Sequence, residues 1–132
     1  MEKAQSKRIL IIDDEPDLLD LVERRLTKVG FSVTKALNGV LAIETLKSQT
    51  FDAVLCDINM PGGISGFDVF DFIHATFKPQ MPFVFVTGHG EGTPEMTRAL
   101  GLGVDAVFSK PVSSKVLISQ LEMLMNRSSQ VD

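Results

Sequence analysis

Acidic side chains follow two apolar segments of this sequence and could together bind a metal ion. Asp13 and Asp14 follow residues 7–12, and Asp57 follows residues 51–56. Both segments are apolar enough to form strands buried on both faces, which is typical of a parallel sheet covered by helices. Because ligands bind outside the carboxyl ends of the strands in an open α/β sheet, we expect the three carboxylates to share one cleft. Their mutual repulsion and their oxygen atoms favour a hard cation such as Mg²⁺.

Two other kinds of polar group end predicted strands further along the chain. Thr87 ends the apolar segment 82–87, and Lys110 follows the segment 104–109. If these strands join the same parallel sheet, a hydroxyl and an ammonium group reach the cleft that holds the carboxylates. This set of groups suits phosphoryl transfer to a carboxylate, in which a metal and a lysine neutralise the phosphoryl oxygens while an aspartate attacks.

Strand-like and helix-like segments alternate five times along the chain. The expected strands are residues 7–13, 31–36, 51–57, 82–87 and 104–109. The expected helices are residues 15–29, residues 39–49 after a cap at Asn38, a segment opened by a capping box at 65–68, a short segment opened by 93–95, and residues 113–126. Strands and helices that alternate at this spacing form βαβ units with right-handed crossovers. The predicted fold class is α/β, a doubly wound five-stranded parallel sheet flanked by helices.

Apolar periodicity predicts which side of each helix faces the core. On the second helix we expect Val40, Ile43 and Leu46 to be buried. On the last helix the expected buried residues are Val116, Leu117, Leu121, Leu124 and Met125.

The length of 132 residues, with 44% hydrophobic and 23% charged residues, predicts one globular domain over 1–132, with a core at about 7–126 and polar ends at 1–6 and 127–132. The net charge of −4 gives no support for nonspecific nucleic-acid binding. No apolar run approaches the ~20 residues that span a membrane, and the polar start lacks the apolar segment of a signal peptide. The single cysteine, Cys56, cannot form an internal disulfide, which favours the cytoplasm, and its apolar segment predicts a buried, inert thiol.

Over essentially its whole length the chain resembles a response-regulator receiver domain of two-component signalling. The matching residues are Asp13-Asp14, Asp57 with Met60-Pro61, Thr87, and Lys110-Pro111. Their order and spacing are together highly specific, whereas each motif alone would be weak. The resemblance implies the flavodoxin-like (βα)5 fold of stand-alone, chemotaxis-type receivers.

The resemblance also implies a role for each acidic position. Asp57 is expected to be the nucleophile and phosphoacceptor. Asp14 is expected to coordinate Mg²⁺ directly and Asp13 through water, with the backbone carbonyl of Asn59 completing the protein's ligands. Mg²⁺ is the one cofactor that the resemblance implies.

The remaining matching residues are expected to contact the phosphoryl group after its transfer. Lys110 would pair with Asp57 and then with the phosphoryl oxygens, and its bond to Pro111 is expected to be cis. Thr87 would donate its hydroxyl to a phosphoryl oxygen. Its movement would change the surface formed by the fourth helix, the fifth strand and the fifth helix.

The implied function is a phosphorylation-controlled switch in a two-component or phosphorelay pathway. A histidine kinase or a histidine phosphotransfer protein would be the phosphodonor, and a downstream protein would be the target. The chain would act as a monomer or weak dimer, without direct nucleic-acid contact or membrane insertion. It would not be a classical enzyme, because it catalyses only its own phosphorylation and dephosphorylation.

Two alternatives stay open at this point. One is a Mg²⁺-dependent phosphatase with an aspartyl nucleophile, of the haloacid-dehalogenase type, which typically has a second acid where this chain has Asn59 and also has a cap domain. The other is a receiver segment from a hybrid kinase or a DNA-binding regulator, in which residues 127–132 would be part of a linker.

Val107 marks a departure from the family pattern, which usually has Tyr or Phe three residues before the lysine. The neighbouring Phe108 is expected on the opposite face of the strand, because side chains alternate. We therefore expect activation to rely on Thr87 and on backbone shifts in the glycine-rich segment 88–103. In that segment His89 is either at the rim of the site or a solvated loop histidine.

Overall fold

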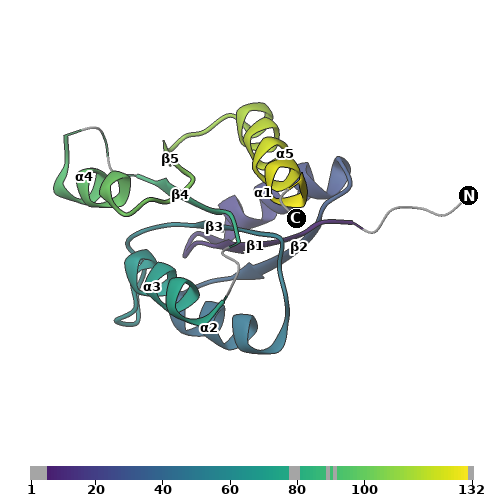
Figure 1. The fold of residues 1–132 in the computed structure, drawn as a ribbon. Helices are drawn as coiled ribbons and strands as arrows, with labels where there is room; N and C mark the ends of the chain where they lie inside the picture. The colour runs from purple at the N-terminus through teal and green to yellow at the C-terminus, as the bar shows by residue number, and fades with distance from the viewer. Residues whose placement is uncertain (1–5, 78–80, 89, 91, 131–132) are drawn as a thin grey trace, which may run out of the picture.

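The computed structural model describes residues 6–77, 81–88, 90 and 92–130, the last four of these as helix backbone only. One sheet of parallel strands runs through the molecule in the order β2-β1-β3-β4-β5 (Figure 1). The strands are β1 (Arg8–Ile12), β2 (Ser32–Ala36), β3 (Ala53–Cys56), β4 (Phe83–Thr87) and β5 (Ala106–Ser109). The sequence predicted each of these strands and the doubly wound α/β class, and both predictions are confirmed.

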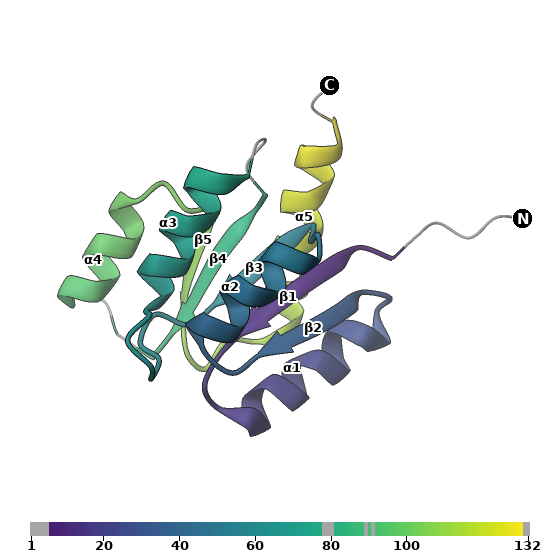
Figure 2. The same cartoon turned by 90° about the horizontal axis from the view of Figure 1, so that it is seen from below.

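Helices cover both faces of the sheet. They are α1 (Pro16–Lys28), α2 (Gly39–Ser48), α3 (Gly66–Thr76), α4 (Pro94–Gly101) and α5 (Ser114–Gln130). Alternate strand residues face opposite sides. Ile9 and Ile11 of β1 pack in a cluster with α1 and α5, whereas Leu10 and Ile12 pack in a cluster with α2, α3 and α4. Figures 1 and 2 show α2 and α3 together on one side of the sheet and α5 on the other.

Helix starts follow the predicted capping residues. The Asn38 side chain accepts a hydrogen bond from the backbone N–H of Leu41 at the start of α2. Ser65 and Asp68 form a capping box at the start of α3, and Thr93 caps α4. The cap at Ser65 matters most for function, because it fixes where α3 leaves the loop after β3.

The structure corrects three predictions about the helices. Val40 is 41% exposed and Val116 is 50% exposed, although both were expected in the core. In α2 the buried positions are Gly39, Ala42 and Leu46, because Gly39 packs directly against Ile64 and this contact turns Val40 outward.

In α5, Leu117 and not its neighbour Val116 faces the sheet, since adjacent helix positions differ by about 100°. The third correction is the end of α5, which extends to Gln130 where the helix was expected to end at about 126. Neither glycine nor proline stops the helix there.

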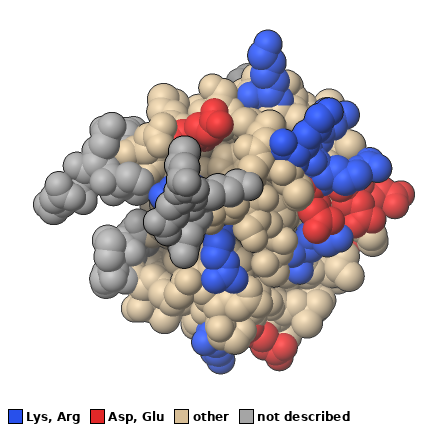
Figure 3. All heavy atoms as spheres, turned by 90° about the vertical axis from the view of Figure 1, so that its right-hand side faces the viewer, with Lys and Arg blue, Asp and Glu red and all other residues tan. Residues whose placement is uncertain are grey.

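Charged side chains of both signs lie on the face shown in Figure 3, with uncharged surface between them. This mixture agrees with a composition of 13 basic and 17 acidic residues. Among the described residues, no helix has the length and apolar character needed to cross a bilayer.

Candidate functional site

The carboxyl ends of β1 and β3 bring the predicted aspartates together. Ile12 pairs with Cys56 in the parallel register, so the residues that follow them, Asp13 and Asp57, are neighbours. The backbone N–H of Asp57 donates to the carbonyl of Ile12 at 2.9 Å, which fixes this junction. Both aspartates are buried, so their carboxylates lie in a cleft with limited access to water.

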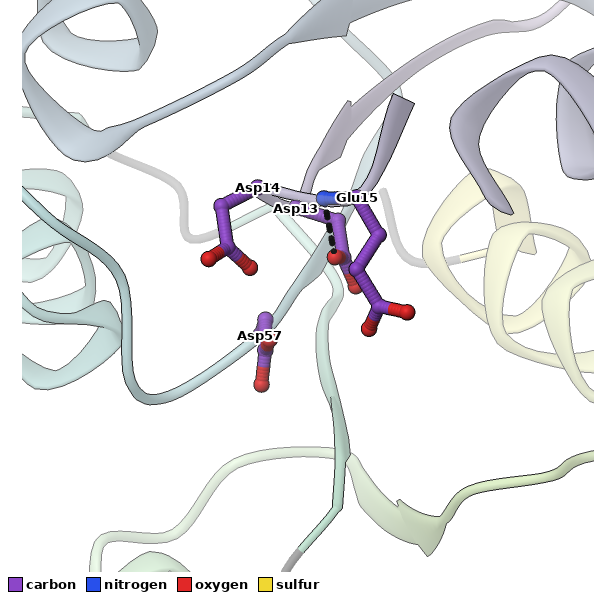
Figure 4. Close-up of side chains that lie close together, drawn as sticks. All are labelled: Asp13, Asp14, Glu15 and Asp57. Atoms are coloured by element: carbon purple, nitrogen blue, oxygen red, sulfur yellow. Dashed lines mark hydrogen bonds between the residues drawn. The ribbon is translucent and has the colours of Figure 1, made fainter. Parts of the chain in front are cut away.

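Four carboxylates meet in this cleft, those of Asp13, Asp14, Glu15 and Asp57 (Figure 4). One oxygen from each lies within 4.8 Å of the others. A donor set made only of carboxylate oxygens fits a hard cation such as Mg²⁺. The cluster could therefore hold the predicted metal.

Glu15 is a member of this cluster that was not predicted from the sequence. It precedes Pro16 and has an extended backbone, with φ −102° and ψ 103°. Residues two apart in an extended segment point to the same side, so Glu15 follows Asp13 toward the cleft. The acid two positions after Asp13 was the signal that could have identified it.

The ammonium group of Lys110 lies among these carboxylates. Its Nζ is 2.7 Å from Asp13 Oδ2, 3.0 Å from Glu15 Oε2 and 3.2 Å from Asp57 Oδ2. The backbone positions this side chain, since the N–H of Lys110 donates to the carbonyl of Thr87 at 2.7 Å. The peptide bond from Lys110 to Pro111 is cis, as predicted.

The pKa values of Asp57, Asp13 and Lys110 all lie above their usual values, but for different reasons. Burial raises the pKa of Asp57, although the charge of Lys110 and the hydrogen bond from the Ile58 N–H act against it. Burial likewise raises the pKa of Asp13. For Lys110, burial lowers the pKa, but the bonds to Asp13 and Glu15 and the charge of Asp57 outweigh it, and the pKa lies above its usual value. The ammonium is therefore fully charged at neutral pH.

Cys56, which precedes Asp57, is buried, and burial raises the pKa of its thiol well above the usual value. A thiol in this state is a poor nucleophile, in agreement with the inert role that the sequence predicted.

The loop after β3 holds the phosphoacceptor candidate against the start of α3. Asp57 Oδ1 accepts a hydrogen bond from the N–H of Ile58 at 2.7 Å. The N–H of Gly66 donates to the carbonyl of Ile58, also at 2.7 Å. A side chain at Gly66 would overlap the carbonyl oxygen of Asp57, so the close approach of this helix requires glycine. The helix and the carboxylate are thus held as one unit.

Three other residues were predicted from the sequence to lie at or near this site. Thr87 is fully buried at the end of β4, beside the strand that leads to Lys110. Asn59 is exposed in the loop after Asp57, and the metal contact of its carbonyl stays a prediction. His89 lies outside the described residues.

The strand that precedes Lys110 has the predicted arrangement. Val107 packs against the cluster of α2, α3 and α4, whereas Phe108 packs against the cluster of α1 and α5. Both side chains are partly buried. Phe108 therefore faces away from the side on which the family places its moving aromatic ring.

We predict one Mg²⁺ site that depends on Asp14. Asp14→Ala removes one of the clustered carboxylates and an expected direct ligand, so Mg²⁺ affinity should fall by at least about tenfold. Calorimetric titration of the wild type and the variant measures this change. Asp20→Ala is the control, because it removes an exposed carboxylate that pairs with Lys35 outside the site. Equal Mg²⁺ affinity in Asp14→Ala and wild type would refute the assignment.

Comparison with known proteins identifies relatives for this fold and this site. The sequence model of the response regulator receiver domain family matches residues 9–122. The transcriptional regulatory protein GlrR of Escherichia coli (strain K12) is 32% identical over 120 residues, which cover 91% of this chain and 26% of that protein. The uncharacterized transcriptional regulatory protein YrkP of Bacillus subtilis (strain 168) is 33% identical over 120 residues, 91% of this chain and 50% of that protein. The chain thus spans half or less of these curated relatives.

Solved structures of response regulators also resemble this chain in fold. A CheY-like response regulator receiver domain protein from Methanospirillum hungatei JF-1 has a TM-score of 0.86 and 27% identity, covering 96% of this chain and 98% of that one. The response regulator protein TrrA from Thermotoga maritima, solved in complex with Mg(2+)-BeF, has a TM-score of 0.76 and 29% identity, covering 89% of this chain and 98% of that one.

Proposed function

The chain belongs to the response regulator receiver domain family of two-component systems, and from this premise we propose that Asp57 is its phosphoacceptor. The observation that carries the proposal is the contact between Lys110 Nζ and Asp57 Oδ2 at 3.2 Å inside the carboxylate cluster. A cation beside one carboxylate can stabilise the charge of a phosphoryl group transferred to it. The family match favours this function over an aspartyl-nucleophile phosphatase.

The phosphodonor we propose is a histidine kinase or a histidine phosphotransfer protein. A carboxylate oxygen of Asp57 attacks the phosphorus of the phosphohistidine, an O–P bond forms as the P–N bond breaks, and the imidazole leaves with the electron pair. Lys110 neutralises charge on the phosphoryl oxygens. Mg²⁺ held by Asp13, Asp14, Asp57 and the Asn59 carbonyl would supply further neutralisation of those oxygens.

Transmission of the signal starts at Thr87 in this proposal. Its hydroxyl donates to a phosphoryl oxygen, and the resulting shift changes the surface of α4, β5 and α5. A downstream protein reads that surface, while nucleic acid and membrane make no direct contact with this domain. We further propose one receiver domain over 1–132, acting in the cytoplasm as a monomer or weak dimer and catalysing only its own phosphorylation and dephosphorylation. The greater length of the relatives leaves room for an attached output or kinase domain.

Phosphorylation with a small donor tests the proposed acceptor directly. The protein is incubated with acetyl phosphate and Mg²⁺, and the phosphorylated residue is located by borohydride trapping and peptide mass spectrometry. We expect the label on Asp57. A label on Asp13, Asp14 or Glu15 in place of Asp57 would contradict the proposed mechanism.

We predict that signal output does not need the side chain of Val107. Beryllofluoride with Mg²⁺ should slow amide exchange in peptides that cover 88–103, because ordering a glycine-rich segment protects its backbone. Val107→Ala should leave this slowing largely intact, whereas Thr87→Ala should remove most of it. Hydrogen exchange with mass spectrometry measures both variants. A loss of the response in Val107→Ala equal to that in Thr87→Ala would show that position 107 carries the signal after all.

A further inference from the structure

We infer that Glu15 is a positioning residue that restrains Lys110 and lowers the affinity of the site for a phosphoryl group. The inference rests on the proposed function and adds a residue to it. Glu15 is 60% exposed, and its Oε2 is 3.0 Å from Lys110 Nζ across 95 positions of the sequence. It thereby connects the N-cap position of α1 to the lysine after β5.

The contacts of Lys110 account for every proton of its ammonium group. An ammonium has three N–H donors, and three carboxylates of the described residues lie within 3.2 Å of Nζ. Each of Asp13, Glu15 and Asp57 can accept one hydrogen bond from it. A phosphoryl oxygen on Asp57 therefore finds no uncommitted donor on Lys110 until one of these contacts opens.

Burial indicates which contact opens at least cost. The side chains of Asp13 and Asp57 are 6% and 10% exposed, whereas that of Glu15 is 60% exposed. Water can solvate Glu15 after the lysine leaves, but it can hardly reach the two buried carboxylates. Lys110 should therefore exchange Glu15 for the phosphoryl group. The charge of Glu15 also repels the arriving anion, which adds to the restraint.

The position of Glu15 separates this role from metal binding. In Figure 4 the side chains of Asp14 and Glu15 extend to opposite sides of Asp13. Glu15 pairs with the lysine, whereas Asp14 is the expected direct ligand of the cation. Glu15 is thus placed to act on Lys110 more than on the cation.

Glu15→Gln is a clean test, because the structural contacts of this residue belong to its backbone. Its N–H donates to Asp13 Oδ1, and its carbonyl accepts from the N–H of Leu19. Within the described residues its side chain makes no capping hydrogen bond to α1. Glutamine keeps the size and the two backbone contacts and removes only the charge.

The experiment measures beryllofluoride affinity at saturating Mg²⁺ for the wild type, Glu15→Gln and Asp17→Asn, together with the Mg²⁺ affinity of each. Asp17 lies in the first turn of α1, two residues after Glu15, so Asp17→Asn removes an equal charge close to the start of the helix. We expect Glu15→Gln to bind beryllofluoride about twofold to fivefold more tightly, the range of an exposed ion pair. The gain should shrink as salt is raised, because the Glu15 charge is screened. Asp17→Asn should match the wild type.

Three results would overturn the inference. Unchanged or weaker beryllofluoride binding in Glu15→Gln would show that Glu15 does not restrain Lys110. An equal gain in Asp17→Asn would assign the effect to net charge alone. A loss of Mg²⁺ affinity in Glu15→Gln as large as that in Asp14→Ala would make Glu15 a metal ligand. By contrast, a wild-type protein that fails to bind beryllofluoride, or binds it equally after Asp57→Asn, would refute the proposed function itself.

Discussion

Replacement of Asp57 by asparagine is expected to reduce phosphoryl incorporation by at least about a thousandfold, because a carboxamide is a far weaker nucleophile than a carboxylate. Asparagine has nearly the same size, so the packing of this buried residue is kept. It can still accept from the N–H of Ile58, as Oδ1 of Asp57 does at 2.7 Å. The loss should therefore be one of chemistry and not of fold. Radiolabel transfer from a histidine kinase, with circular dichroism of both proteins, measures this.

Asp71→Asn is the matched control for that experiment. Asp71 is exposed on α3, so the substitution changes the net charge equally and leaves the cleft untouched. It should accept phosphoryl groups at the wild-type rate. Full labelling of Asp57→Asn would show that another residue is the acceptor, whereas equal loss in Asp71→Asn would assign the effect to charge on the surface that meets the kinase.

The residues at the ends of strands could be predicted because parallel sheets impose their own geometry. Asp13, Asp57 and Lys110 directly follow strands, and Thr87 ends one. These strands run parallel, so all their carboxyl ends lie on one side of the sheet. The position of a residue at the end of its strand is therefore enough to place it near the cleft, and the packing of side chains need not be known. For this reason the sequence predicted both the fold class and the position of the cleft.

Features that depend on contacts between helices and loops could not be predicted in the same way. The exposure of Val40 follows from the packing of Gly39, the first residue of α2, against Ile64 in the loop before α3, and helical periodicity does not predict such a contact. The ion pair of Glu15 with Lys110 depends on where α1 begins relative to the end of β5. A shift of one or two residues in that helix start would move the carboxylate away.

The contact between α3 and Asp57 predicts a second large effect, that of Gly66→Ala. A methyl group at position 66 would overlap the carbonyl oxygen of Asp57 and lie 3.0 Å from Cα of Ile58. These are backbone atoms, which cannot rotate aside, so α3 and the loop after β3 must separate. We expect the free energy of unfolding to fall by about 3 kcal/mol, as in other overpacked sites. Urea denaturation, with a check that the m-value is unchanged, measures this loss.

The same substitution should also impair phosphorylation in the molecules that remain folded. The N–H of Gly66 holds the carbonyl of Ile58 at 2.7 Å, and Ile58 in turn donates to the Asp57 carboxylate, so a displaced helix moves the nucleophile. A displacement near 1 Å can cost about a hundredfold in rate. Gly101→Ala is the control, since a Cβ there meets no atom within 4 Å and alanine favours the end of α4. Wild-type stability and labelling in Gly66→Ala would mean that α3 does not position Asp57, whereas loss of both in this variant alone would tie the start of α3 to the chemistry at the end of β3.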